Sequence, residues 1–151
     1  MAKGNSHIAS NLARLRADAE WIREHPGIYP MERWLRLPLA LSKAGQFDEA
    51  INEFHRLLDE VDWRLNIEVP RQRPGGDPPR SVFLEKFGHL SRFQIYEQMS
   101  FACKRQNMLE PAARYILLAD QHYQAFLDMS VESYYHRSTH ERATTDHNPS
   151  A

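Results

Sequence analysis

Residues 44–51, Ala-Gly-Gln-Phe-Asp-Glu-Ala-Ile, read as a tight turn between two helices. Gly45 suits the left-handed backbone that commonly follows the last residue of a helix. Asp48 and Glu49 suit the first turn of the next helix, where the helix dipole favours acidic side chains. A turn this short predicts that the two flanking helices form an antiparallel hairpin.

The flanking segments carry apolar residues at helical spacing. Upstream, a helix is expected from Pro30, through Trp34 and Leu41, to Lys43. Pro38 lies inside this segment and is expected to kink or split the helix. Downstream, a helix is expected as far as Leu65, with these residues on its apolar face: Ala50, Ile51, Phe54, Leu57, Leu58 and Val61.

Three more helices are expected further from the turn. The first is capped by Asn5 or Ser6 and ends at residues 25–27. Another runs from Pro78 to Gln106, with Phe87 on its core face, and the last runs from Leu109 to Tyr135. Asn107, with Glu110 three residues later, resembles a capping arrangement for this last helix. No segment alternates polar and apolar residues as a strand would, so the fold class is all-α.

The expected domain organisation is simple. Residues 1–136 form a single helical domain, residues 66–80 form its one long internal loop, and residues 137–151 form a polar, flexible tail. The loop is assigned from its prolines and its Gly75-Gly76 pair, which leave no room for the interior of a helix.

The first hairpin, residues 31–64, resembles a tetratricopeptide repeat. The match rests on the spacing of eight residues: Trp34, Leu37, Leu41, Gly45, Phe47, Ala50, Ile51 and Phe54. Pro38, Leu41 and Leu57 depart from the residues usual in that family. A second unit, residues 93–126, resembles the repeat through these residues: Tyr96, Met99, Ser100, Cys103, Ala112, Ile116 and Ala119. Asn107 replaces the glycine of the turn, since asparagine also tolerates a left-handed backbone.

The resemblance implies a short right-handed array of about five helices. Two repeats bury less surface than the three or so that such arrays usually need. The first helix, the inserted loop region or a second copy of the chain is therefore expected to cover the exposed ends.

The resemblance also implies a binding groove lined by the first helix of each repeat. It places these partner-binding candidates there: Leu35, Leu39, Lys43, Glu97, Phe101, Lys104 and Arg105. The lysine and asparagine clamp with which some family members hold a peptide carboxylate is missing. An apolar strip bordered by basic residues would suit an amphipathic helix with acidic edges. Alternatively, Leu35, Leu39 and Phe101 are core residues covered by the first helix.

Composition argues against several other functions. The net charge of −1 gives no global field that would attract nucleic acid, and no binding motif accompanies the arginines of the 66–80 loop. The single cysteine excludes an internal disulfide and favours a cytoplasmic protein, and we expect no membrane span. No metal site or cofactor is expected, because His136 and His140 lie near the polar tail.

Three functions remain open at this point. The first is a non-enzymatic adaptor that binds a partner peptide or helix. The second is a self-associating or inhibitory helical protein whose groove is occupied by an obligate partner or a second copy. The third is a small helical enzyme that uses His136, His140 or Cys103. Cys103, however, falls on a core face, where a lone cysteine behaves as a small apolar residue.

Overall fold

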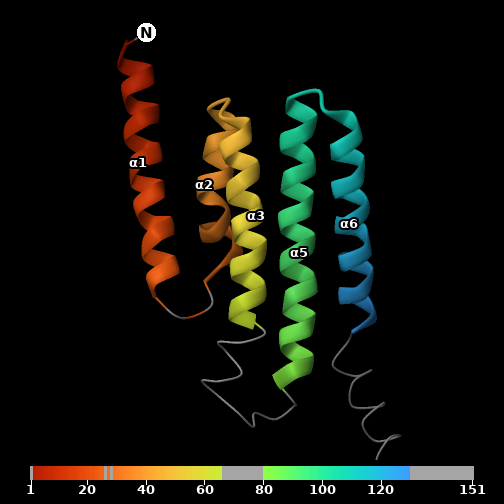
Figure 1. Cartoon of the computed structure of the whole chain (residues 1–151). Coiled ribbons are helices and arrows are strands. Elements are labelled where there is room, and N and C mark those ends of the chain that lie inside the picture. The colour runs from red at the N-terminus through yellow and green to blue at the C-terminus, as the bar shows by residue number, and fades with distance from the viewer. Residues whose placement is uncertain (1, 26, 28, 66–79, 130–151) are drawn as a thin grey trace, which may run out of the picture.

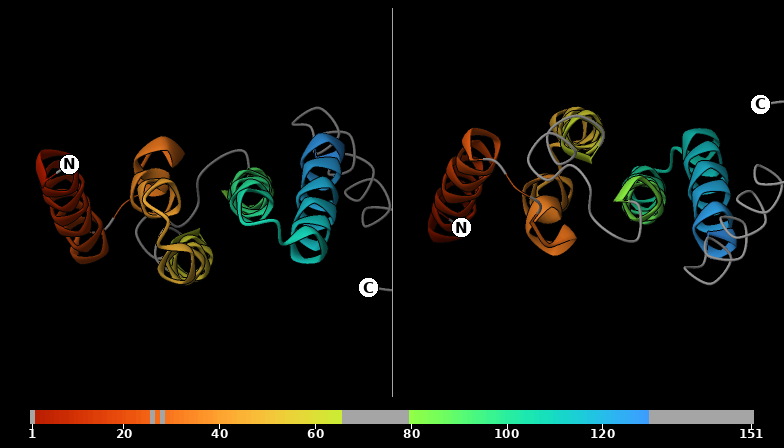
Figure 2. Two further views of the ribbon diagram at one scale, coloured as in Figure 1. Left: turned by 90° about the horizontal axis from the view of Figure 1, so that it is seen from above. Right: turned by 90° about the horizontal axis from the view of Figure 1, so that it is seen from below.

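The computed structural model describes residues 2–25, 27, 29–65 and 80–129. The described residues form helices and no strand, which confirms the all-α prediction. The helices are α1 (Ala2–Glu24), α2 (Met31–Lys43), α3 (Phe47–Trp63), α5 (Arg80–Arg105) and α6 (Leu109–Asp128). They stand side by side and alternate in direction, with α1 at one end of the row and α6 at the other (Figures 1 and 2).

Both tight turns lie where the sequence predicts them. Gly45 follows α2 with a φ of 80°, and Asn107 follows α5 with a φ of 57°. Each turn therefore uses the left-handed backbone that glycine and asparagine adopt at the lowest cost. Asn107 consequently does not cap α6, because the N-cap residue is Met108 and no side chain caps this helix end.

Several predicted helix features are wrong in detail. The first helix begins at Ala2, so Asn5 and Ser6 lie inside it and do not cap it. Pro38 does not split α2, which is one continuous helix over 13 residues. The last helix ends at Asp128, seven residues before the expected Tyr135, and residues 130–151 lie outside the described part of the chain. The predicted tail and nearly all of the 66–80 loop also lie outside it.

The larger core lies where α2, α3 and α5 meet. Phe54 of α3 and Ile95 of α5 are fully buried there, and Leu35 of α2 is 7% exposed. Their spacing along each helix places them on one face, so the three helices share a single apolar interior. Phe87 is an exception, because this predicted core residue is 55% exposed.

A smaller core fixes α1 against the first hairpin. Leu12 and Leu15 of α1 pack with Leu37 and Leu41 of α2 and with Ala50 of α3. The first helix therefore covers one side of α2, which is one of the three ways in which the exposed ends were expected to be covered. This side differs from the side of α2 that faces α5.

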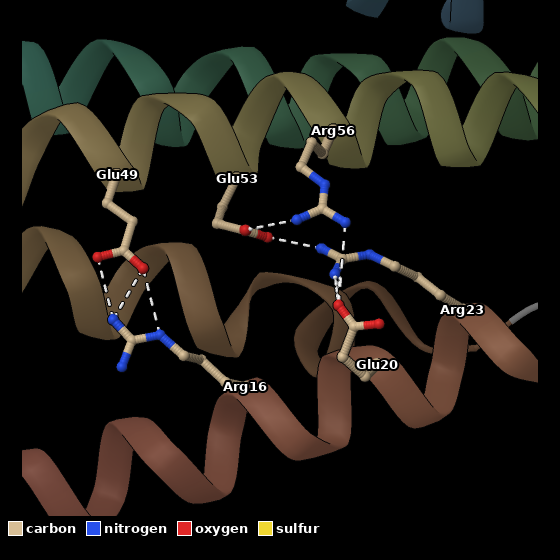
Figure 3. Close-up of polar contacts among 6 residues, drawn as sticks. All are labelled: Arg16, Glu20, Arg23, Glu49, Glu53 and Arg56. Atoms are coloured by element: carbon tan, nitrogen blue, oxygen red, sulfur yellow. Dashed lines mark hydrogen bonds and ion pairs between the residues drawn. The ribbon is translucent and has the colours of Figure 1, made fainter.

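Ion pairs on the surface strengthen the attachment of α1 (Figure 3). Arg23 contacts Glu53 of α3 at 2.6 Å and Glu20 of its own helix at 2.5 Å. Arg16 contacts Glu49 at 2.7 Å. Because these arginines reach across to α3, they restrict rotation of α1 about its apolar seam with α2.

In the part of the chain that the structure describes, no helix combines the length and apolar character that a membrane span requires.

Candidate functional site

A hollow of about 380 Å³ opens between α2 and α5, with the end of α3 as its floor. From α2 and the segment before it come Tyr29, Met31 and Trp34, and from α3 and the residues that follow it come Val61, Arg64 and Leu65. The wall on α5 is formed by Phe87, Leu90, Ser91 and Gln94. A mainly apolar hollow of this size, with a few polar groups, is typical of a binding site.

Two aromatic residues shape the α2 side of the hollow. Trp34 Nε1 donates a hydrogen bond of 3.0 Å to the carbonyl of Tyr29, and the two rings meet edge to face at 5.8 Å. Tyr29 in turn donates to the carbonyl of His25 at 3.3 Å. Both rings are held from two directions, so this wall is formed before any ligand arrives.

Arg64 lies in the floor of the hollow, and its side chain forms hydrogen bonds to other residues of the same chain. Its side chain is only 3% exposed. It pairs with Glu60 at 2.8 Å, and it donates to the carbonyls of His25 at 2.9 Å, Gly27 at 2.7 Å and Ile22. These carbonyls end α1, where a cation is favourable because the helix dipole is negative. Arg64 therefore fixes the link between α1 and α2 at the edge of the hollow.

Ser91 and Gln94 are the polar residues of the hollow whose side chains are available to a ligand. They lie one helical turn apart on α5, and both side chains face the hollow. Among the described residues, neither side chain forms a hydrogen bond that holds it elsewhere. A hydroxyl and an amide can both donate and accept, so this wall offers polar contacts to a ligand without imposing a charge.

The sequence-predicted site residues fall into two groups. Leu35 is buried in the core that faces α5, and Leu39 is partly buried against the same core. The helix that covers them is α5, and the alternative expectation that α1 covers them is wrong, because α1 packs on Leu37 and Leu41 instead. Phe101 is 38% exposed, so it is no core residue.

The basic candidates lie where α2 and α5 end. Lys43, Lys104 and Arg105 are all exposed, and Nη1 of Arg105 lies 3.3 Å from Oγ of Ser42. The nitrogen of Lys104 lies 5.9 Å from the centre of the Phe101 ring, within cation–π range. Glu97 is partly buried one turn before Phe101. Lys104 and Arg105, with Phe101 beside them, therefore form one surface, which we call the basic end. Lys43 lies instead beside Asn11 and Leu12 of α1.

Sequence reasoning missed the hollow itself. It placed the groove on α2 and α5, but towards the turns, whereas the hollow lies at the other end of both helices. Trp34 and Phe87 read as core residues from their spacing. Only the separation of α2 and α5 above the end of α3 leaves them beside open space, and spacing along one helix does not carry that information.

The groups considered for catalysis do not assemble around the hollow. Cys103 is 1% exposed, which confirms its predicted core position, and burial raises the pKa of its thiol. His136 and His140 lie outside the described residues. Within those residues, no three histidine, cysteine or acidic side chains come together as metal ligands.

No protein-family model matches the chain, and no curated protein or solved structure is significantly similar to it.

Proposed function

We propose that this chain is a non-enzymatic protein-interaction module, a tetratricopeptide-like adaptor that binds an amphipathic helix along the face between α2 and α5. The observation that carries the proposal is the preformed apolar hollow beside Trp34 and Phe87. An anchoring aromatic or branched side chain of a partner would bury its surface there, and such anchors dominate the affinity of many interfaces.

The basic end would fix which way the partner helix runs along the protein, because acidic residues of the partner would lie against its cations. Arg105 lies eleven residues beyond Gln94 on α5, which is about three full turns, so the hollow and the basic end lie on one face of α5, about 16.5 Å apart at 1.5 Å per residue. A partner helix that lies along α5 would therefore carry its apolar anchor and its acidic residues about eleven positions apart, on one face. Phe101 lies beside the basic end and offers a second apolar contact.

A designed peptide tests this arrangement. The probe is a fluorescent 16-residue amphipathic helix with one tryptophan and, eleven positions later on the same face, a pair of glutamates. We expect saturable binding to the wild-type protein. Binding should fall when Ser91→Phe fills the hollow, and also when Lys104→Glu reverses a charge at the basic end. Added salt should weaken the binding of wild type more than that of Lys104→Glu, because it screens the attraction between Lys104 and the glutamates.

Leu117→Glu is the matched control, because Leu117 is 59% exposed on α6, away from both sites. Pull-down followed by mass spectrometry applies the same comparison to cellular partners, with Phe101→Glu as the variant at the basic end. A partner that binds wild type and Leu117→Glu equally, but is lost from Ser91→Phe and Phe101→Glu, would support the proposal. Equal capture by all four proteins would contradict it.

Self-association is a second candidate, and the surface of α6 favours it. Four apolar residues on this terminal helix are exposed: Leu109 at 64%, Leu117 at 59%, Tyr123 at 38% and Leu127 at 49%. Exposed apolar surface of this extent is frequently an interaction site. Sedimentation at increasing protein concentration measures the oligomeric state. A dimer that forms through α6 should dissociate in Leu117→Glu and persist in Ser91→Phe.

A further inference from the structure

Two histidines join α5 to α6 in the half of the hairpin that lies away from its turn. Nδ1 of His89 lies 3.0 Å from Nδ1 of His122, and the ring centroids are 5.3 Å apart. The distance between the ring centroids is about equal to the distance between the two nitrogens plus the radius of each ring, so both nitrogens lie on the line that joins the centroids. Each nitrogen therefore points head-on at the other, and the contact is a nitrogen-to-nitrogen hydrogen bond.

A contact of this kind holds one proton and no more. One Nδ1 must carry a hydrogen while the other presents its lone pair. If both nitrogens were protonated, two N–H groups would face each other and the bond would become a repulsion. A bound metal ion suits the geometry less well, because the two lone pairs oppose each other and do not converge on a common point, and the described residues supply no third ligand.

The surroundings make the two histidines unequal. Nε2 of His89 lies 3.9 Å from a carboxylate oxygen of Glu85, so a hydrogen on Nε2 faces a negative charge. His122 has its pKa lowered, first by burial and then by the charges of Arg92 and His89, against a smaller opposing effect of Asp62. When the His89 ring carries a hydrogen on both nitrogens, its Nδ1 donates and Nδ1 of His122 is the acceptor.

The neighbouring groups on each helix are fixed. Arg92 of α5 is ion-paired with Asp62 of α3, so its positive charge stays beside the pair. The Tyr96 ring of α5 stacks on His122, with centroids 5.8 Å apart and planes 11° apart. On α6, the residues one turn from His122 are Leu118 and Phe126, which do not titrate. Glu85, Arg92 and Asp62 are thus the charged groups that face the pair among the described residues.

We propose that His89 and His122 form a proton-sensitive latch between α5 and α6. The latch is closed while the pair shares a single Nδ1 proton. A solvent proton that binds Nδ1 of His122 removes the acceptor lone pair, and the two imidazolium rings then separate. The main packing partner of α6 is α5, so the opening releases the end of α6, from His122 to Asp128, while α1, α2 and α3 stay folded.

The direction of the pH effect follows from His122. Its pKa in the folded protein is lower than in the unfolded chain, where histidine titrates near about 6.5. The open state therefore takes up the proton first, and the latch is fully closed above that pH. As the pH falls below about 6.5, one linked proton shifts the opening equilibrium by about tenfold per pH unit.

Imidazole nitrogen NMR on the wild-type protein tests the latch directly. We expect Nδ1 of His89 and Nδ1 of His122 to share a hydrogen-bonded proton at neutral pH, and the signal of that proton to disappear as His122 protonates below the ordinary histidine range. Amide hydrogen exchange should accelerate at residues 122–128 across the His122 step and stay unchanged in α3. Independent titration of the two rings, or uniform exchange across all helices, would overturn the proposal.

His122→Asn provides the variant test, because the asparagine amide lies near the position of Nδ1 and carries no titrating group. Its α6 exchange rates, corrected for the intrinsic pH effect, should be flat between pH 7 and 5. His55→Asn is the control and should keep the wild-type transition. If His122→Asn shows the same acid transition as wild type, His122 is not the sensor. The NMR titration remains decisive if this variant fails to fold.

Discussion

The hydroxyl of Ser100 donates a hydrogen bond of 2.9 Å to the backbone carbonyl of Ala112, inside the contact between α5 and α6. Ser100 is fully buried and Ala112 is 1% exposed. Small residues on the two helices allow this close approach, and the hydrogen bond satisfies a hydroxyl that would otherwise be buried without a partner.

Substitution of Ser100 separates the hydrogen bond from the packing. Ser100→Ala should lower the free energy of unfolding by about 1 kcal/mol, since only the hydrogen bond is lost. Ser100→Leu should cost about 1–3 kcal/mol or more, because the larger side chain forces the helices apart. Denaturant unfolding measures both. Equal stabilities for the two variants would show that α5 and α6 are not in close contact there.

Charge placed in either core should prevent folding. Ala50 and Phe54 are both fully buried, as their spacing predicted. Ala50→Asp and Phe54→Asp would each bury an unpaired carboxylate, at a cost of several kcal/mol, roughly the whole stability of a domain this size. Thermal melts followed by circular dichroism provide the measurement. A cooperative melt within a few degrees of wild type would contradict this core assignment, and exposed Asn52→Asp serves as the control.

Much of the fold could be predicted because its signals are local. Gly45 and Asn107 mark their turns through backbone preference alone, and the burial of Phe54 follows from the helical period. The exposure of Phe87 could not be predicted, because its position on α5 suits a core face equally well. Only the distance between α2 and α5 leaves it at the edge of a hollow.

The contact between His89 and His122 was the least predictable part. His89 and His122 are 33 residues apart, on different helices, and nothing in either neighbourhood marks them as a pair. Their meeting depends on the register of α5 against α6, which packing at Ser100 and Ala112 sets. Lys43, Lys104 and Arg105 were expected at a groove only because the resemblance to the repeat family places the first helix of each unit there.

The ion pair between Arg23 and Glu53 should contribute measurably to the docking of α1. The two side chains are 20% and 13% exposed, so solvent screens them only partly. Arg23→Gln should destabilise the protein by about 1–3 kcal/mol, through loss of a charge-assisted bond. The control is Arg16→Gln, whose pair with Glu49 is about 44% exposed and should be worth less than about 1 kcal/mol. Urea unfolding of both variants makes the comparison, and equal losses would refute the ranking.

Acid should weaken the contact between α1 and α2 through Asp18. Its side chain lies 2.7 Å from Arg33, and that hydrogen bond is the main cause of its lowered pKa. Because the folded pKa lies below the unfolded one, the stabilisation is complete above about pH 4 and is lost as the pH falls through the folded value. Asp18→Asn should therefore be less stable than wild type at pH 7, and the difference should vanish near pH 2. A constant difference would contradict this account, and exposed Asp59→Asn is the control.

Cys103 should be unreactive in the folded protein. Its side chain is 1% exposed, and burial raises the pKa of its thiol, so little thiolate forms and little of it meets solvent. A disulfide thiol reagent can then react only when the α5–α6 contact opens. An opening that costs about 3 kcal/mol slows the reaction about a hundredfold relative to an exposed thiol. The reference is Lys104→Cys in a Cys103→Ala background, where the thiol lies one residue further along and is exposed. Equal rates for the two proteins would show that Cys103 is accessible, and would reopen the case for it as a nucleophile.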